Sequence, residues 1–280
     1  MRSLCKMKKI GFVDYYISEW HANNYPGWIH ELTDEYRVSY AWAELDVGPR
    51  DGVTTDQWCE KFGAERCATI AELCEKSDVI VILAPGDPDK HLAYAKEVLP
   101  FGKRTYIDKT FAPDAAEAAE IFALAEKYGT PFFSTSALRY ASELDAVEAC
   151  RSIVTTGSGR TVDEYIIHQA EMVVKKLGLG AKAVRADGTP DFCTFRVRYD
   201  DDRNATMIFS GAHPFTVCMK GNSTAYKPVT SDFFKALIAD MVRFFGEGTI
   251  SFDTRETMEV MRLREIALKA LETPDTWVEL

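Results

Sequence analysis

The fold is decided by the stretch Asp78-Val-Ile-Val-Ile-Leu-Ala-Pro85-Gly-Asp-Pro88, which leads through a helical segment with His91 to Thr105-Tyr-Ile-Asp108-Lys109-Thr110. The apolar run at the start is typical of a buried strand, and the Pro-Gly-Asp-Pro sequence ends it in a turn. A second short strand then places Lys109 at its carboxyl end. Open parallel sheets bind ligands at the carboxyl ends of their strands. The stretch therefore predicts one strand-helix-strand unit with a ligand site beside Lys109.

The rest of the first half repeats this alternation of short strands and longer helices. Strands are expected at 10–13, 38–43, 79–83, 104–107 and 131–134, and helices at 20–32, 69–75, 92–99 and 115–128. Asp114 is a suitable N-cap for the last of these helices, and Gly129 is a suitable stop. Such alternation predicts an N-terminal Rossmann-like parallel sheet covered by helices on both faces.

The second half has a different pattern. A helix is expected at 142–155, ended by Gly157-Ser-Gly159, and alternating strands at 191–199 and 205–209 are joined by the acidic turn 200–202. Strands at hairpin spacing indicate an antiparallel sheet. Helices follow at 232–245 and 254–271. The prediction is an α/β protein with a Rossmann-like domain over 1–137 and a reduced α/β domain over 138–280 with an open, mainly antiparallel sheet.

Composition narrows the class of protein. With 280 residues the chain is long enough for two cores, and its net charge of −10 disfavours nucleic acid and anionic membranes as partners. The basic start lacks the long apolar core of a signal peptide, and no apolar run has the length of a membrane span. Seven cysteines, odd in number and without a close CxxC pair, indicate reduced thiols. We expect a cytoplasmic protein.

The segments quoted above resemble the glucose-fructose oxidoreductase and inositol dehydrogenase (Gfo/Idh/MocA) family. That family has an apolar strand ending in Thr-Pro, then a His, then a Glu-Lys-Pro motif with the catalytic lysine. Here the motif is Asp108-Lys109-Thr110, so the lysine is kept and both neighbours differ. The stretch 244–280 also resembles the family's C-terminal helices and final strand. The resemblance implies NAD(P)-dependent oxidoreduction of a sugar, polyol or related hydroxy compound by hydride transfer.

Lys109, Glu164 and His168 are the expected catalytic residues. A lysine at a strand end beside a cleft can exchange a proton with a substrate hydroxyl, although an ordinary lysine is a solvated surface charge. The resemblance places His168 as the catalytic histidine, with Glu164 four residues before it to orient the imidazole and the pair facing Lys109 across a cleft. Because residues i and i+4 meet on a helix, a plain surface Glu–His pair is the alternative.

The first strand-to-helix turn departs from a dinucleotide site. It reads Gly11-Phe-Val-Asp14-Tyr-Tyr16-Ile17-Ser-Glu19, with Asp14, Tyr16 and Glu19 where glycines are usual. Side chains there obstruct the close approach of a pyrophosphate, and each carboxylate would repel it by about 4 kcal/mol at about 4 Å for an effective dielectric of ~20. The expected cofactor is NAD or NADP, weakly bound or absent, with contacts from Asp14, Tyr16, Ile17, Glu44, Pro85 and His91. For Glu44 the alternative is a solvated strand end, and for His91 it is a structural role. The alternative is a cofactor-free descendant that acts as a small-molecule binder or an assembly subunit.

Arg139 and Tyr140 follow the last strand of the first half, where the family often has an Arg-Tyr or Arg-Phe pair near the substrate. They are the expected substrate contacts, and a salt bridge that links the domains is the alternative for Arg139. No metal site is expected, since the five histidines lack HxH or HxxxH spacing.

A homodimer or higher homo-oligomer is expected, formed through the second-half sheet. The strand pattern places five apolar residues on that sheet: Phe192, Phe195, Val197, Met207 and Phe209. With few helices left in the shortened domain, we expect one face of the sheet to lack cover within the chain. Uncovered apolar faces usually form interfaces, and two-fold dimers are the commonest assemblies.

Overall fold

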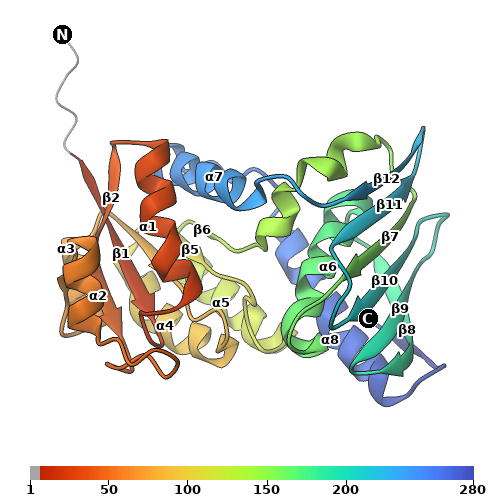
Figure 1. Cartoon of the computed structure of the whole chain (residues 1–280), viewed down its shortest axis with the longest axis horizontal. Helices are drawn as coiled ribbons and strands as arrows, with labels where there is room; N and C mark the ends of the chain where they lie inside the picture. Colours follow the sequence, from red (N-terminus) through yellow and green to blue (C-terminus); the bar gives the residue numbers. More distant parts are fainter. Residues whose placement is uncertain (1–6) are drawn as a thin grey trace, which may run out of the picture. The chain divides into compact units, whose positions relative to one another are not determined.

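The computed structural model describes residues 7–280, which form two compact units. The first unit contains residues 7–134 together with Ile238–Ser251, and the second contains Thr135–Leu237 with Phe252–Leu280 (Figure 1). Within the described part of the chain, no helix combines the length and apolar character that crossing a membrane requires.

Residues 238–251, which the sequence pattern assigned to the second domain, pack with the first unit. Two aromatic contacts explain this, because the ring of Phe244 lies 5.0 Å from that of Phe133 and the ring of Phe245 lies 6.0 Å from that of Tyr36. Arg104 also donates hydrogen bonds to the carbonyl oxygens of Phe245 and Gly246. A segment distant in sequence thereby completes the core of the first unit.

The first unit is built on a six-stranded parallel sheet in the order β3-β2-β1-β4-β5-β6, which confirms the predicted Rossmann-like sheet. Its strands are β1 Lys8–Asp14, β2 Tyr36–Ala43, β3 Glu65–Arg66, β4 Val79–Ile82, β5 Thr105–Ile107 and β6 Phe132–Phe133. Every residue of β4 and β5 is buried. Strands covered on both faces read as continuous apolar runs, as β4 does.

The helices of the first unit follow the predicted pattern with one addition. They are α1 Trp20–Leu32, α2 Thr55–Phe62, α3 Ile70–Lys76, α4 His91–Val98 and α5 Ala115–Tyr128, with short 3-10 turns at Pro88–Lys90 and Leu99–Phe101. The Asp114 carboxylate caps α5 by accepting from the backbone of Glu117, and Gly129 ends it in the left-handed conformation. Helix α2 is the addition, and a capping box of Thr54 and Gln57 begins it.

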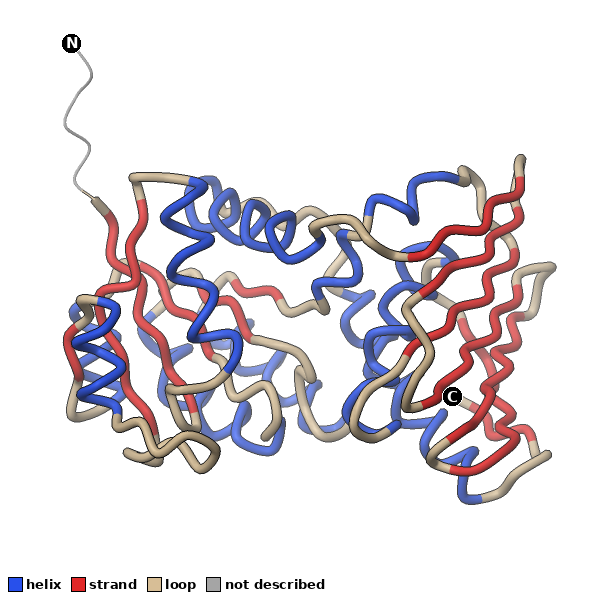
Figure 2. Tube along the Cα trace, viewed as in Figure 1, coloured by secondary structure: helices blue, strands red, loops and turns tan. Residues whose placement is uncertain are grey.

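The second unit contains a seven-stranded sheet in the order β12-β11-β7-β10-β9-β8-β13. Figure 2 draws the strands in red. Its strands are β7 Ser152–Gly157, β8 Ala181–Thr189, β9 Phe192–Tyr199, β10 Asn204–Ser210, β11 Thr216–Lys220, β12 Thr224–Pro228 and β13 Trp277–Glu279. Only β7 and β10 pair in parallel, so the predicted mainly antiparallel sheet is confirmed.

The helix predicted at 142–155 is wrong. Short 3-10 turns lie at Ala137–Tyr140 and Ser142–Ala146, and the following residues form strand β7. The physical reason is the run Ile153-Val-Thr-Thr156, because four consecutive β-branched residues lose side-chain freedom in a helix and pack well in a strand.

Helices α6 Val162–Leu177 and α8 Arg255–Glu272 pack on one face of this sheet, and α7 Phe233–Glu247 begins in the second unit and ends in the first. The covered face holds four of the five residues assigned to an open interface, namely Phe195, Val197, Met207 and Phe209, each at most 2% exposed. That part of the interface prediction is wrong, because these apolar side chains form the core beneath the helices. Phe192 is 53% exposed.

Candidate functional site

The strongest candidate site of the first unit lies at the carboxyl ends of β1, β4 and β5. Strand β1 sits between β2 and β4, so the chain crosses over in opposite directions on its two sides. Open parallel sheets bind their ligands at such a switch point. The turn from Tyr15 to Glu19 leads from β1 into α1 at this edge.

Asp14, the last residue of β1, is a buried carboxyl group that is 1% exposed. Its Oδ1 accepts hydrogen bonds from the backbone amides of Tyr15 at 2.7 Å and Ala84 at 2.9 Å. Its Oδ2 is buried without a hydrogen-bond partner among residues 7–280. Burial, together with the nearby Glu19 carboxylate, raises the pKa of Asp14 well above its usual range.

This raised pKa predicts the pH dependence of an Asp14→Asn variant. Because the folded protein holds the Asp14 proton more tightly than the unfolded chain, this contribution to stability is fully present below the ordinary Asp pKa of about 3.9 and is lost as the pH rises through the native pKa. Asparagine keeps the acceptor oxygen and carries no charge. We expect Asp14→Asn to melt above the wild type at pH 8, with the difference shrinking toward pH 5.

Thermal unfolding followed by circular dichroism from pH 5 to pH 8 checks this expectation. Asp191→Asn, at an exposed position of the second unit, is the matched control. If the melting temperatures of Asp14→Asn and the wild type differ by the same amount at every pH from 5 to 8, the Asp14 pKa is not raised in the folded protein.

Glu19 occupies the N-terminus of α1 with its own carboxylate. The side chain is 8% exposed and accepts hydrogen bonds from the backbone amides of His21, at 2.7 Å, and Ala22. Burial raises the pKa of this carboxyl group as well. The first amides of a helix are the donors that hold phosphate in dinucleotide sites. In this chain Glu19 uses two of them.

A buried histidine–aspartate pair adjoins this cap. The His21 Nδ1 atom hydrogen-bonds to Asp108 Oδ2, and the Tyr106 hydroxyl donates to Asp108 Oδ1 at 3.1 Å. The ring of Tyr25 stacks on that of His21 at 5.3 Å. Burial alone would raise the pKa of Asp108, but the contact with His21 and the charge of Lys109 hold it below its usual range. His21 was not among the predicted site residues, because its partner Asp108 lies 87 residues away in the sequence.

Lys109 lies just after β5, as predicted, and reaches the turn after β4. Its Nζ atom donates a hydrogen bond to the carbonyl oxygen of Pro85 at 3.0 Å. The structure therefore brings together two of the predicted site residues, Lys109 and Pro85, and places the Asp108 carboxylate beside the start of α1. The role of Lys109 in proton transfer stays a prediction.

Glu44 and His91, two expected cofactor contacts, are engaged by the protein itself. Glu44 accepts hydrogen bonds from Lys90 at 2.7 Å and from the Tyr94 hydroxyl at 2.8 Å, and the bond from Lys90 lowers its pKa. Both ring nitrogens of the fully buried His91 lie at backbone carbonyl oxygens, those of Leu83 and Phe111. Burial lowers the His91 pKa. His91 therefore connects the segment after β4 to the segment after β5 through its two ring nitrogens.

Tyr16 and Ile17 complete the set of expected cofactor contacts. Tyr16 is partly buried, and burial raises the pKa of its hydroxyl. Ile17 is 1% exposed, so its side chain belongs to the core. Gly11, the glycine that precedes this turn in sequence, lies inside β1, where a Cβ atom would come within 2.4 Å of Ser77 Oγ. It serves close packing on α3 and not the approach of a ligand.

These observations test whether the turn fits a dinucleotide. A pyrophosphate needs free amides at the helix N-terminus and room for close backbone approach. Glu19 accepts from the amides of His21 and Ala22, Asp14 accepts from that of Tyr15, and both are buried carboxyl groups. The residues present therefore do not fit a pyrophosphate at the N-terminus of α1.

In the second unit, the predicted Glu164–His168 pair is not formed. Both residues lie on α6, but within the described chain Glu164 makes a two-pronged ion pair with Arg160, at 3.0 and 2.6 Å. The His168 Nδ1 atom hydrogen-bonds to Ser136 Oγ at 2.7 Å. Arg160, four residues before Glu164, has a charged, planar guanidinium that bonds both carboxylate oxygens, and so it is preferred over His168, four residues after. The facing of His168 and Lys109, which lie in different units, stays a prediction.

Arg139 lies in a buried ion-pair cluster of the second unit. Its Nε atom bonds to Glu171 at 2.5 Å, and its Nη2 atom bonds to Glu256 at 2.7 Å. The guanidinium carbon also lies 4.1 Å from the centre of the Phe252 ring. All four residues belong to one unit, so the cluster does not link the two units. Tyr140 beside it is partly buried, and its substrate role stays a prediction.

No metal centre emerges in residues 7–280, where no three His, Cys, Asp or Glu side chains are grouped so that they could hold an ion.

Comparisons with known proteins identify a fold. No family model matches the chain. Over 64 residues it is 38% identical to the uncharacterized oxidoreductase YhhX of Escherichia coli K12, a match that spans 22% of this chain and 19% of that protein.

Solved structures align over nearly the whole chain, and two of them illustrate the shared fold. GenD2 from gentamicin A biosynthesis, in complex with NAD, has a TM-score of 0.79 at 14% identity and covers 99% of this chain and 98% of its own. Apo scyllo-inositol dehydrogenase from Lactobacillus casei has a TM-score of 0.77 at 13% identity, with 98% of each chain covered.

Proposed function

Because the chain has the Gfo/Idh/MocA-type oxidoreductase fold, we propose that it binds a sugar, polyol or related hydroxy compound without a dinucleotide at the N-terminus of α1. It is then a cofactor-free, non-catalytic small-molecule binder built on an enzyme fold. A cytoplasmic location is part of the same proposal. The observation that carries it is the Glu19 cap, since this carboxylate takes two of the backbone donors at the start of α1 that a pyrophosphate would use.

The edge of the sheet supports recognition of hydroxyl groups. Lys109 and the carboxyl groups of Asp14, Glu19 and Asp108 lie at or next to the carboxyl ends of β1 and β5. The Lys109 amine is a charged donor, Asp14 Oδ2 is an acceptor without a partner in residues 7–280, and hydrogen bonds that involve a charged group are the stronger ones in proteins. A polyhydroxy compound offers several donors and acceptors at once, whereas a polyanion would meet three acidic side chains.

An NAD(P)-dependent oxidoreductase acting on the same compounds is the second candidate. One observation favours it: Lys109 lies at the end of β5, within hydrogen-bond reach of the turn after β4, where the resemblance expects the catalytic lysine. The solved structure of GenD2 with NAD also shares the fold. This candidate requires the dinucleotide to bind without the amides that Glu19 uses.

Titration of the purified protein into NADH and NADPH, followed by nucleotide fluorescence, separates the two candidates. The proposal expects no saturable change with either nucleotide up to about millimolar concentration, where weak ligands with binding free energies near −4 kcal/mol would still register. Calorimetry with myo-inositol, sorbitol and D-glucose then tests the binder itself, with Lys109→Ala as the variant expected to weaken any binding.

Tight binding of NADH or NADPH by the wild-type protein would contradict the proposal and favour the second candidate, the NAD(P)-dependent oxidoreductase. Absence of heat with all three hydroxy compounds, together with no nucleotide binding, would remove the hydroxy-compound class from the proposal.

We also infer a homodimer, formed through the face of the second-unit sheet opposite α6 and α8. The pairing register places Val154, Cys218 and Tyr226 side by side on that face, and Tyr226 is 64% exposed. Ile208 on β10 and the exposed Phe192 extend the row. Exposed apolar patches on a sheet usually mark an interface.

Light scattering after gel filtration is expected to give about twice the 31.5 kDa mass of the chain. A double variant, Ile208→Lys with Tyr226→Lys, is expected to elute as a monomer, because buried unpaired charges oppose association. Tyr128→Lys, at a 40% exposed aromatic residue of α5, is the control that leaves the dimer intact. A wild-type mass of one chain at micromolar concentration would refute the dimer.

A further inference from the structure

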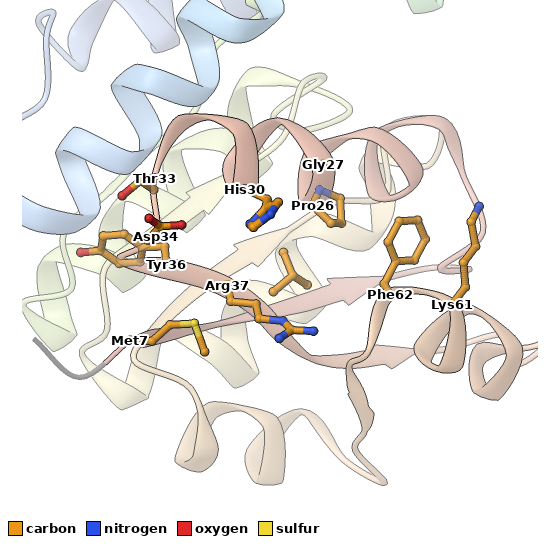
Figure 3. A pocket seen from close by; sticks show the side chains of 11 residues that line it. Met7, Pro26, Gly27, His30, Thr33, Asp34, Tyr36, Arg37, Lys61 and Phe62 are labelled. Carbon is orange, nitrogen blue, oxygen red and sulfur yellow. The ribbon is translucent and has the colours of Figure 1, made fainter. Parts of the chain in front are cut away.

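A cavity of the first unit lies away from the candidate site at the carboxyl ends of β1, β4 and β5. It has a volume of about 570 Å³ and opens between the C-terminal half of α1, the start of β2 and the end of α2 (Figure 3). Tyr36 and Val38, at the start of β2, line it, whereas Asp14 lies at the far end of the neighbouring parallel strand. The cavity therefore adjoins the opposite edge of the sheet.

The wall formed by α1 has an unusual composition. Pro26 and Gly27 lie in the middle of this helix, and both line the cavity. Proline and glycine are the two least favourable residues in a helix interior, and Pro26 has no amide to donate to the preceding turn. A Cβ atom built on Gly27 would meet nothing within 4 Å. The missing side chain thus leaves the wall open where a ligand can enter.

The lining carries unpaired positive charge. Arg37 and Lys61 line the cavity with His30, and within residues 7–280 none of the three takes part in an ion pair. Figure 3 shows these side chains around the same space. Gly63 leaves room for the Arg37 guanidinium, since a Cβ atom there would lie 2.7 Å from Nη2. In a protein with a net charge of −10, an anion could pair with these groups without breaking an existing bridge.

The floor of the cavity is apolar. Val38 is 3% exposed, and the Phe62 ring stands beside the Lys61 amine at 4.8 Å from its centre. A few charged groups over an apolar surface are the usual make-up of a small-molecule site, and such sites commonly enclose roughly 300–1,000 Å³. Asp34 also lines the cavity, so the lining carries one acidic side chain beside the two cations Arg37 and Lys61.

We propose that this cavity binds a small amphipathic anion, a carboxylate or phosphate carried on an apolar or aromatic body. The anionic group pairs with Arg37 and Lys61, and the body lies on Val38 and Phe62 against the open wall at Gly27. The site is separate from the hydroxy-compound site, and its occupation does not depend on that function.

Fluorescence of 8-anilinonaphthalene-1-sulfonate, an aromatic anion, tests the proposal on the full-length protein. We expect saturable binding with one dye per chain, displaced by octanoate and by phenyl phosphate but not by octanol, the uncharged analogue of octanoate. Displacement by octanoate alone or by phenyl phosphate alone identifies which anionic group the cavity prefers. Affinity is also expected to fall as salt is added, because the cations are partly exposed.

Two kinds of variant locate the dye. Arg37→Gln with Lys61→Gln is expected to weaken binding by about tenfold or more, the equivalent of one lost charge-assisted hydrogen bond. Gly27→Phe fills the cavity and is expected to abolish binding, while Gly211→Phe, at an equally open glycine of the second unit, leaves it unchanged. Arg37 and Lys61 lie at the surface, so the charge variant stays informative if Gly27→Phe does not fold.

Unchanged dye affinity in the Arg37→Gln, Lys61→Gln double variant, or equal displacement by octanol and octanoate, would overturn the proposal. The same holds if the wild type shows no saturable binding.

Discussion

Replacing Glu19 with glycine is expected to raise the affinity of the protein for NADH by about tenfold or more. The substitution frees the backbone amides of His21 and Ala22 and removes a buried carboxylate from the helix N-terminus. One carboxylate at about 4 Å from a phosphate costs about 4 kcal/mol at an effective dielectric of ~20, and solvent and relaxation reduce that penalty. Calorimetry with NADH and NADPH measures the change.

Adding Asp14→Asn to Glu19→Gly is expected to increase the gain. Glycine at position 14 is the less informative choice, because Asp14 Oδ1 accepts from the amides of Tyr15 and Ala84 and glycine would leave both without a partner. Asparagine removes the charge and keeps that acceptor.

Asp114→Gly is the matched control for the Glu19 experiment. Asp114 also caps a helix of the first unit with its carboxylate, but at α5. Its loss should alter stability and leave NADH affinity unchanged. If folded Glu19→Gly protein binds NADH no better than the wild type, then the Glu19 cap is not what excludes the dinucleotide.

Replacing Arg139 with alanine is expected to lower the free energy of unfolding by about 3–5 kcal/mol. Arg139 is 5% exposed and pairs with Glu171, which is 3% exposed, and with Glu256. Removing the guanidinium leaves the Glu171 carboxylate buried without its cation. A loss of this size is a large share of the roughly 5–15 kcal/mol that stabilises a typical domain.

Urea unfolding followed by fluorescence measures this loss. Arg255→Ala is the control, because Arg255 is exposed and pairs with the neighbouring Asp253 at the surface, where an ion pair contributes at most about 1 kcal/mol. Equal unfolding midpoints for Arg139→Ala and Arg255→Ala would show that the buried cluster adds nothing beyond a surface pair.

The sequence predicted those features that depend on local pattern. Strand β4 is a continuous apolar run, and α5 has strong periodicity between the cap at Asp114 and the stop at Gly129. Both are set by residues near one another in the chain. The same reasoning failed at β7, where a helix was expected and β-branched residues favoured a strand.

The candidate site was predicted less completely, because its contacts join distant residues. Lys109 and Pro85 were placed from a motif, and the structure joins them. The pairing of His21 with Asp108 and the cluster around Arg139 bring together residues far apart in sequence, which no spacing rule reveals. For Glu164 the spacing allowed two partners, and the charged guanidinium of Arg160 prevailed over His168.

The return of residues 238–251 to the first unit has a consequence for proteolytic fragments. The chain passes from one unit to the other three times, near residues 134, 237 and 251. A protease that cuts once between the units therefore cannot release the first unit as a single covalent piece. A gene truncated after Ser134 would also lack Phe244 and Phe245, so its product would expose the aromatic surface of Phe133 and Tyr36 to water. Such a fragment is expected to aggregate unless 238–251 is supplied as a separate peptide or joined directly to residue 134.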